Sequence, residues 1–149
     1  MVQVVLPNDA NPLGFILGGT VMHLIDIAAA IACFRHARQR VVTAAVDGLQ
    51  FLHPIKVGDL IILKAEVSAT FRTSMEVEVR VMSEKTLTGE RMLTSHAYLT
   101  FVAIDADGRR VEVPDLVLET DAERQRAEQA RARRDARLAA KKSLAATEG

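Results

Sequence analysis

Asp26 is the residue whose type and surroundings point most directly to chemistry in this chain of 149 residues. It lies in an apolar run, FILGGTVMHLIDIAAAIACF, at residues 15–34. On a helical wheel its side is small and apolar, no Lys or Arg lies three or four residues away, and His23 is its only local polar companion. Folds tolerate an unpaired buried carboxylate mainly for function, because burial is costly or raises the pKa. Asp26 is thus a candidate general base or nucleophile, or else a structural carboxylate that pairs with a backbone amide or a distant arginine.

Two nearby features could assist such a carboxylate. Gly18-Gly19-Thr20 comes at the expected start of a helix, where free N–H groups and the helix dipole favour negative charge. Because the glycines lack Cβ atoms, a ligand can approach the backbone closely, as in an oxyanion hole; the alternative is a tight turn. Asn11 lies in the preceding loop, where it could orient a water or a carbonyl, or simply form a turn.

The remaining polar candidates are fewer. Arg72, Thr73 and Ser74 come between two expected strands and could hold a phosphate; the alternative is a polar strand turn. The four histidines show no metal-ligand spacing, so no metal site is expected. Cys33 lies on an apolar helix and is expected in the core. As the single cysteine, it excludes an internal disulfide and indicates a reducing, cytoplasmic setting.

Hydrophobic periodicity indicates the elements that must position these residues. The pattern predicts a short strand over 2–6, a loop over 8–14 and an all-apolar helix from about 18 to 38. It then becomes two-fold and predicts a series of strands over 41–52, 60–70, 74–84 and 91–104, with a short edge strand at 111–113. One helix can cover the face that such strands leave open. We therefore expect an α+β fold in which an antiparallel sheet of five or six strands wraps around one long buried helix.

The tail differs in composition from the rest of the chain. We expect one domain over 1–118 and an Ala/Arg-rich helical extension over 119–149. A capping box, Thr120 to Glu123, predicts where its helix starts. Because only Leu138 and Leu144 could anchor it firmly, we expect a solvated helix. The alternative is an oligomer contact or a weak anion-binding arm.

Charge and hydropathy limit the classes of partner. Lys and Arg number 19, as do Asp and Glu, so net charge gives no reason to expect nucleic acid or an anionic membrane. The run at 15–34 is long enough to cross a bilayer, but an intramembrane Asp26 would be costly. No secretory signal is apparent at the start of the sequence. We expect a core helix and no membrane partner.

A set of motifs in a fixed order carries a family resemblance. They are LPNDANPLG from residue 6, LGG from 17, LIDIAA from 24, VT from 42, FLHPIKVGD from 51, RTSMEV from 72, TGER from 88 and TFVAID from 100. Together they resemble the hotdog-fold acyl-CoA thioesterases, specifically the bacterial short acyl-CoA hydrolases and the brain-type acyl-CoA hydrolase domains. The likeness spans about residues 4–116. Pro12 and Phe71 depart from residue types common in the family.

The resemblance implies a fold, an assembly and a reaction. The fold is the hotdog, and the assembly is a double-hotdog homodimer, often a trimer of dimers and hence a hexamer. The reaction is hydrolysis of acyl-CoA to a free carboxylic acid and CoA. No cofactor is implied, because CoA is part of the substrate and product. Active sites would lie at the dimer interface.

The resemblance also carries residue roles. Asn11 of one subunit and Asp26 of the other would face the same thioester, and the amides around Gly18 to Thr20 would face its carbonyl oxygen. Arg72-Thr73-Ser74 matches the segment that lies along CoA in this family.

Two rival functions remain open at the level of sequence. A hotdog acyl-CoA binder that does not hydrolyse would keep Arg72 to Ser74 without needing Asp26. A hotdog hydratase or dehydratase would need a His paired with an acidic residue, and His23 lies three residues before Asp26.

Overall fold

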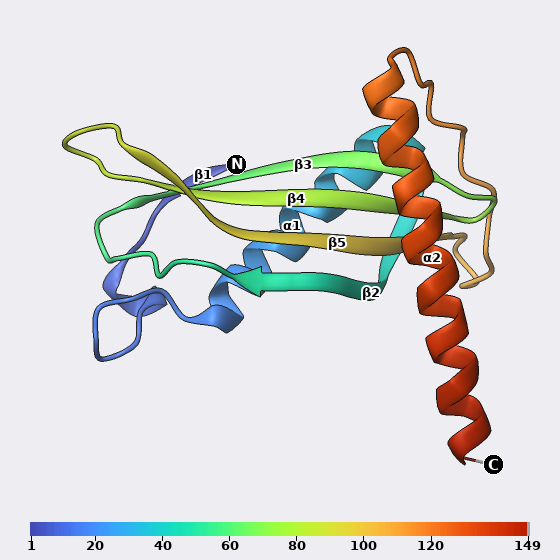
Figure 1. Ribbon diagram of the computed structural model, residues 1–149, viewed down its shortest axis with the longest axis horizontal. Helices are drawn as coiled ribbons and strands as arrows, with labels where there is room; N and C mark the ends of the chain where they lie inside the picture. The colour runs from blue at the N-terminus through green and yellow to red at the C-terminus, as the bar shows by residue number, and fades with distance from the viewer. Residues whose placement is uncertain (149) are drawn as a thin grey trace.

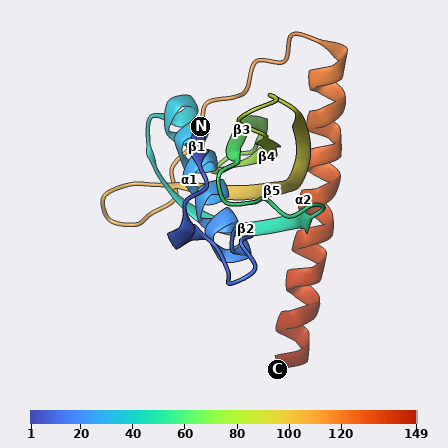
Figure 2. The same ribbon diagram turned by 90° about the vertical axis from the view of Figure 1, so that its left-hand side faces the viewer.

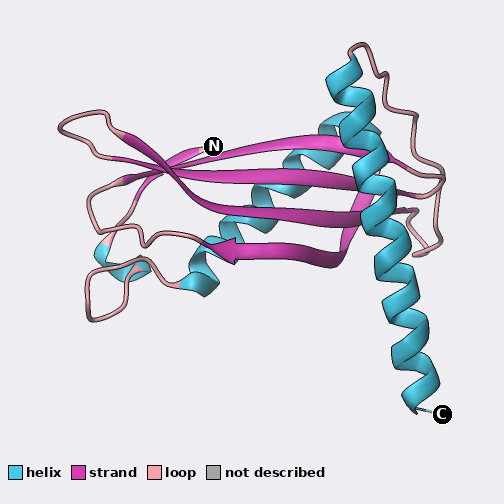
Figure 3. Ribbon diagram, in the orientation of Figure 1, coloured by secondary structure: helices cyan, strands magenta, loops and turns pink. Residues whose placement is uncertain are grey.

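The structure is a computed structural model that describes residues 1–148. One antiparallel sheet separates two helices that lie on its opposite faces (Figures 1 and 2). In chain order the elements are β1 (Val2–Val4), the 3-10 turn η1 (Pro7–Asp9), α1 (Gly18–Ala37), β2 (Arg40–Phe51), β3 (Leu60–Thr70), β4 (Ser74–Glu84), β5 (Arg91–Ile104) and α2 (Asp121–Glu148). The order of strands across the sheet is β1-β3-β4-β5-β2, as labelled in Figure 1; Figure 3 shows the same strands in magenta. The expected α+β fold, a sheet wrapped around one helix, is confirmed.

Alternation of side chains along the strands gives the sheet two different faces. On β4 Met75, Val77, Val79 and Val81 are fully buried and face α1, because successive residues of a strand point to opposite faces. Glu76 points the other way. From α1 the sheet receives one face of small and branched residues: Val21, Leu24, Ile25, Ala28, Ala29, Cys33 and Ala37. The core therefore lies between α1 and the concave face of the sheet.

The opposite side of α1 is apolar but exposed. Met22, Ile27, Ile31 and Phe34 are each between 38% and 47% exposed. By length and composition α1 could cross a membrane, yet 33% of that stretch is buried against the sheet of its own chain. A helix that is apolar all round is normally covered all round. The exposed side of α1 therefore requires a second covering surface.

The short edge strand expected at 111–113 does not form. Ile104 makes only an isolated bridge to Arg110 beyond the Asp105–Gly108 turn. The N–H of Val113 then donates to the carbonyl of Arg72 at 2.9 Å, so the segment crosses the strand ends. The sheet has five strands, and β1 is shorter than the strand expected over 2–6.

The expectation of a solvated tail is wrong for the first part of α2. The helix crosses the outer face of the sheet, and Ala130 is fully buried there (Figure 1). The two leucines expected to anchor it, Leu138 and Leu144, are 42% and 66% exposed. The predicted start is confirmed, because Glu123 N–H donates to Thr120 Oγ1 at 3.1 Å.

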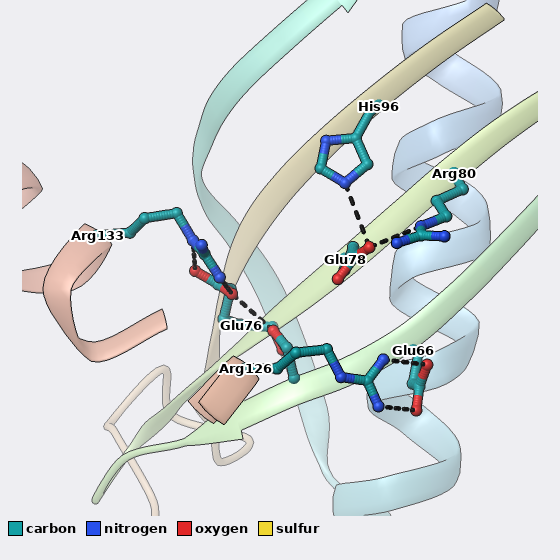
Figure 4. A network of polar contacts seen from close by, with 8 residues as sticks. Glu66, Glu76, Glu78, Arg80, His96, Arg126 and Arg133 are labelled. Atoms are coloured by element: carbon teal, nitrogen blue, oxygen red, sulfur yellow. Dashed lines mark hydrogen bonds and ion pairs between the residues drawn. The ribbon is translucent and has the colours of Figure 1, made fainter. Parts of the chain in front are cut away.

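Arginines anchor α2 to carboxylates on the strands (Figure 4). Arg133 Nε and Nη2 donate to Glu76 Oε2 and Oε1 at 2.9 and 2.7 Å, and Ser68 Oγ donates to the same Oε1 at 2.6 Å. Arg126 makes a forked pair with Glu66 at 3.2 and 3.4 Å. Glu76 is only 2% exposed, so its charge depends on Arg133. Composition alone showed the charges but not their partners.

Candidate active site

Asp26 lies on α1 beside the edge strand β2 and has one hydrogen-bond partner on that strand. Its Oδ1 accepts a hydrogen bond of 2.7 Å from the Thr43 hydroxyl of β2. The carboxylate is half-buried, and it lines a pocket of about 340 Å³. The lining is Gly19, Met22, His23, Ile25, Asp26, Thr43, Val46, Leu49 and Leu99. Asp26 is thus neither fully buried nor unpaired, and its partner is a hydroxyl rather than an amide or an arginine.

Gly19 brings the helix start into the same pocket. A Cβ at Gly19 would meet no atom within 4 Å, so the space above it is open. The Thr20 N–H donates to Leu17 O at 3.0 Å, whereas the N–H groups of Gly18 and Gly19 have no acceptor among residues 1–148. In the described part of the chain, no side chain caps the start of α1. The free amides of the predicted trio are therefore those of Gly18 and Gly19.

Asn11 lies away from Asp26 within one chain. It lines a different pocket, of about 320 Å³, together with Gly18. Its Oδ1 accepts from the backbone N–H of Leu13 and Phe15 at 3.0 and 3.1 Å, so the turn reading of this residue is correct. These bonds leave the amide Nδ2 as the free donor of the side chain within the described residues. A single chain does not bring Asn11 and Asp26 together.

The Arg72-Thr73-Ser74 segment is a tight turn between β3 and β4. Phe71 N–H donates to Ser74 O at 2.8 Å, and the carbonyl of Thr73 accepts from Ala103. Thr73 and Ser74 line a third pocket, beneath α2, but Arg72 does not. The strand-turn reading is therefore correct for the backbone, while two of the three side chains face a pocket.

His23 shares the pocket of Asp26, but within residues 1–148 no hydrogen bond joins them. Cys33 is fully buried, and burial raises the pKa of its thiol to about 12, which confirms a core role. The part of the chain that the structure describes contains no group of three metal-ligating side chains.

Thr43 is the site residue that reasoning from chemistry missed. It lies 17 positions after Asp26, on a different element, so no helical or strand period links the two. The only signal was its place in the VT motif of the family resemblance.

Comparison with known proteins gives the family. The Thioesterase superfamily matches residues 13–90. The uncharacterized acyl-CoA thioester hydrolase YkhA of Bacillus subtilis is 43% identical over 119 residues, which cover 80% of this chain and 69% of that protein. The human cytosolic acyl coenzyme A thioester hydrolase is 34% identical over 135 residues, or 89% of this chain. This chain matches only 36% of the length of the human enzyme.

Solved structures agree in fold. An apo-hexameric acyl-CoA thioesterase superposes with a TM-score of 0.88 at 44% identity and covers 93% of this chain and 88% of its own. The acyl-CoA hydrolase of Staphylococcus aureus, solved with butyryl coenzyme A and coenzyme A, gives 0.86 at 35% identity, covering 100% and 93%.

Three residues substituted in the S. aureus enzyme have the same sequence separations as three candidate site residues of this chain. Structures exist in which an asparagine, an aspartate or a threonine of that enzyme is replaced by alanine. There the aspartate follows the asparagine by 15 positions and the threonine follows the aspartate by 17, the separations of Asn11, Asp26 and Thr43 here. This chain therefore belongs to the Thioesterase superfamily and is a hotdog-fold acyl-CoA thioesterase.

Proposed function

We propose that Asp26 is the general base of acyl-CoA hydrolysis. Thr43 holds one carboxylate oxygen, Oδ1, which leaves Oδ2 free to take a proton from water. The water oxygen attacks the thioester carbonyl carbon, the C–S bond breaks, and the CoA thiolate leaves and takes up the proton. The products are a carboxylic acid and CoA. No cofactor is required, because a carboxylate and water supply every step.

The helix start stabilises the charge that develops on the carbonyl oxygen. The N–H groups of Gly18 and Gly19 are free, and the positive end of the α1 dipole lies behind them. The open space above Gly19 allows the oxygen to approach the backbone. Thr20 lies in the first turn of α1, but its own N–H does not take part in stabilising this charge. The apolar side chains that line the pocket, such as Met22, Val46 and Leu49, receive the acyl chain.

The active site is shared by two subunits. Asn11 and Asp26 line different pockets of one chain, and β2 is an edge strand with exposed Val42 and Val46. A second copy that pairs along β2 and covers the exposed side of α1 would bring its Asn11 to this Asp26, where Nδ2 can orient the water or the carbonyl. Hexameric structures of related thioesterases support a trimer of such dimers. Thr73 and Ser74, with Arg72 at the rim, contact CoA. A cytoplasmic location accords with the cytosolic human relative.

The single observation that carries this proposal is the Thr43–Asp26 hydrogen bond in the pocket that Gly19 also lines. The test is thiol release from acyl-CoAs of graded chain length, with wild type, Asp26→Asn and the exposed control Asp107→Asn. We expect Asp26→Asn to lower kcat by about a hundredfold or more while CoA binding persists. The control should match wild type.

Other outcomes separate the rivals. Binding of CoA without thiol release from any acyl-CoA would indicate a non-hydrolytic binder. Loss of activity in His23→Gln, with Asp26→Asn active, would contradict the role of Asp26. A single turnover in H₂¹⁸O should place the label in the product acid; label in the Asp26 carboxylate would show a nucleophile instead.

A further inference from the structure

A third pocket lies between α2 and the outer face of the sheet. It has a volume of about 420 Å³, and its walls come from β2, β4, β5, the loop after β5 and the second half of α2. The lining consists of Ala44, Ala45, Thr73, Ser74, Thr100, Val102, Arg110, Arg134, Arg137, Leu138, Ala140, Lys141 and Leu144. It is therefore separate from the pocket that contains Asp26.

The lining of this pocket is strongly cationic. Four of its residues are basic, Arg110, Arg134, Arg137 and Lys141, and none is acidic. Arg137 pairs with the nearby Asp47 at 3.4 Å. The other three form no ion pair with residues 1–148. Three positive charges are thus gathered in one concavity without a counter-charge among residues 1–148.

This arrangement is unfavourable for α2 alone. Arg134, Arg137 and Lys141 follow one another at intervals of three and four residues, so they lie on the same side of the helix. Like charges at this spacing repel and destabilise a helix. Arginines of α2 bind sheet carboxylates, and Arg137 does so here with Asp47. Around the other three cations the sheet wall of the pocket offers hydroxyls instead: Thr73, Ser74 and Thr100. Cations combined with hydroxyls are the donor set that binds a phosphate.

The pocket lies directly across the edge strand from the catalytic carboxylate. Ala44 and Ala45 form part of its wall, and Thr43, the residue before them, binds Asp26 from the inner side. The ladder between β2 and β5 is irregular between Thr43 and Ala45. The pocket also reaches Thr73 and Ser74 at the β3–β4 turn, so a ligand with a phosphate group at one end and a long flexible arm could extend around that end of the sheet toward Asp26.

We propose that the cationic pocket of α2 binds the phosphates of the 3′-phospho-ADP end of acyl-CoA. This deepens the proposed function and rests on it, because the pantetheine arm must carry the thioester to Asp26. It makes the C-terminal helix a substrate-binding element. A free nucleotide shares the same phosphate chemistry, so the test must distinguish it from the substrate.

The test compares butyryl-CoA with butyryl-pantetheine, which has the same thioester but lacks the nucleotide. The variant is the double substitution Arg134→Gln with Lys141→Gln. The matched control is Arg131→Gln with Lys142→Gln, which removes two charges from the same helix outside the pocket. We expect the pocket variant to raise KM for butyryl-CoA about tenfold or more, so that the preference for the CoA ester is lost and added salt has less effect on KM. The control should keep that preference.

Two results would overturn the proposal. One is an unchanged preference for the CoA ester in the pocket variant. The other is an equal loss with both substrates, which would show a structural effect. Titration calorimetry with CoA and with ADP measures binding to the pocket even if the protein does not hydrolyse acyl-CoA. The proposed pocket and the proposed hydrolysis can therefore be rejected independently. Weaker ADP binding with an unchanged KM for butyryl-CoA would assign the pocket to a free nucleotide and overturn its role for the substrate.

Discussion

Asp26, the proposed catalytic base, accepts a hydrogen bond from a single hydroxyl, which comes from the edge strand β2. The Thr43 hydrogen bond of 2.7 Å engages Oδ1 of Asp26, and it joins α1 and β2, which supply most of the pocket lining. A carboxylate that acts as a base needs a fixed direction more than it needs deep burial, because proton transfer depends first on geometry. Asp26 accordingly remains half-buried, with open space above Gly19.

Thr43 gives the first prediction, at the scale of one residue. Thr43→Val keeps the shape of the side chain but removes the hydroxyl, so Asp26 loses its orientation. We expect kcat to fall about tenfold to a hundredfold with little change in Tm. Thr43→Ser, which keeps the donor, should recover most of the activity. Equal activity in the Val and Ser variants would show that the hydroxyl does not position the base.

The sequence predicted several candidate site residues but not the residues that they contact. Asp26 was evident as a lone carboxylate in an apolar helix, and Gly18-Gly19 as a helix start, because both signals are local. Thr43 was not, because its contact depends on how β2 returns beside α1. The separation of Asn11 from Asp26 likewise follows from tertiary placement. Only the family resemblance predicted a second subunit at the site, and this remains a proposal.

At the scale of elements, strong alternation made the strands predictable. The bounds expected at 60–70, 74–84 and 91–104 agree with β3, β4 and β5, because each strand has one apolar face toward α1. The expectation for α2 failed for a physical reason. Its anchors are arginines, and a solvated arginine and a buried one look alike until the opposing carboxylate is known. Glu76 and Glu78 lie on the outer face of β4, and both are buried.

Arg133 gives the second prediction, because it neutralises the buried Glu76. Its guanidinium also lies 3.6 Å from the centroid of the Tyr98 ring. Removing one partner of a buried pair leaves an uncompensated charge, so Arg133→Ala should lower the free energy of unfolding by about 3 kcal/mol. Urea unfolding measures this. Arg131→Ala, which removes an exposed arginine of the same helix, is the control and should cost less than about 0.5 kcal/mol. Equal costs would show that α2 is not held by this pair.

Glu78 gives the third prediction, on pH. Burial alone would raise the pKa of Glu78, but hydrogen bonds and charges from Arg80 and His96 outweigh it and hold that pKa below its ordinary value. A lowered folded pKa stabilises the protein above the ordinary carboxyl pKa, and this stability is lost as pH falls through the folded value. The deficit of Glu78→Gln relative to wild type should therefore be largest above about pH 5 and shrink toward pH 3. Urea unfolding across this range measures it, and a constant deficit would contradict the assignment.

At the scale of the whole molecule, one chain leaves two of its surfaces incomplete. Among residues 1–148 the edge strand β2 has no neighbour on its outer side, and α1 exposes the apolar side chains of Met22, Ile31 and Phe34. An exposed edge next to an apolar surface favours association with another strand. The same region holds Asp26, while its proposed partner Asn11 lines another pocket. Under the proposed function, folding one chain therefore yields half of each of two active sites.

This division gives the last prediction, a mixing experiment. Asn11→Ala and Asp26→Asn should each be nearly inactive alone, because each lacks one group at every site. Refolded together in equal amounts, half of the dimers should be mixed. In a mixed dimer one site has both substitutions and the other has neither, since the two sites of a symmetric dimer exchange the same residues. Thiol release should thus recover to about a quarter of the wild-type rate, while each variant refolded with itself should not recover. If both residues instead acted within one chain, every site in the mixture would carry a defect and no activity would return.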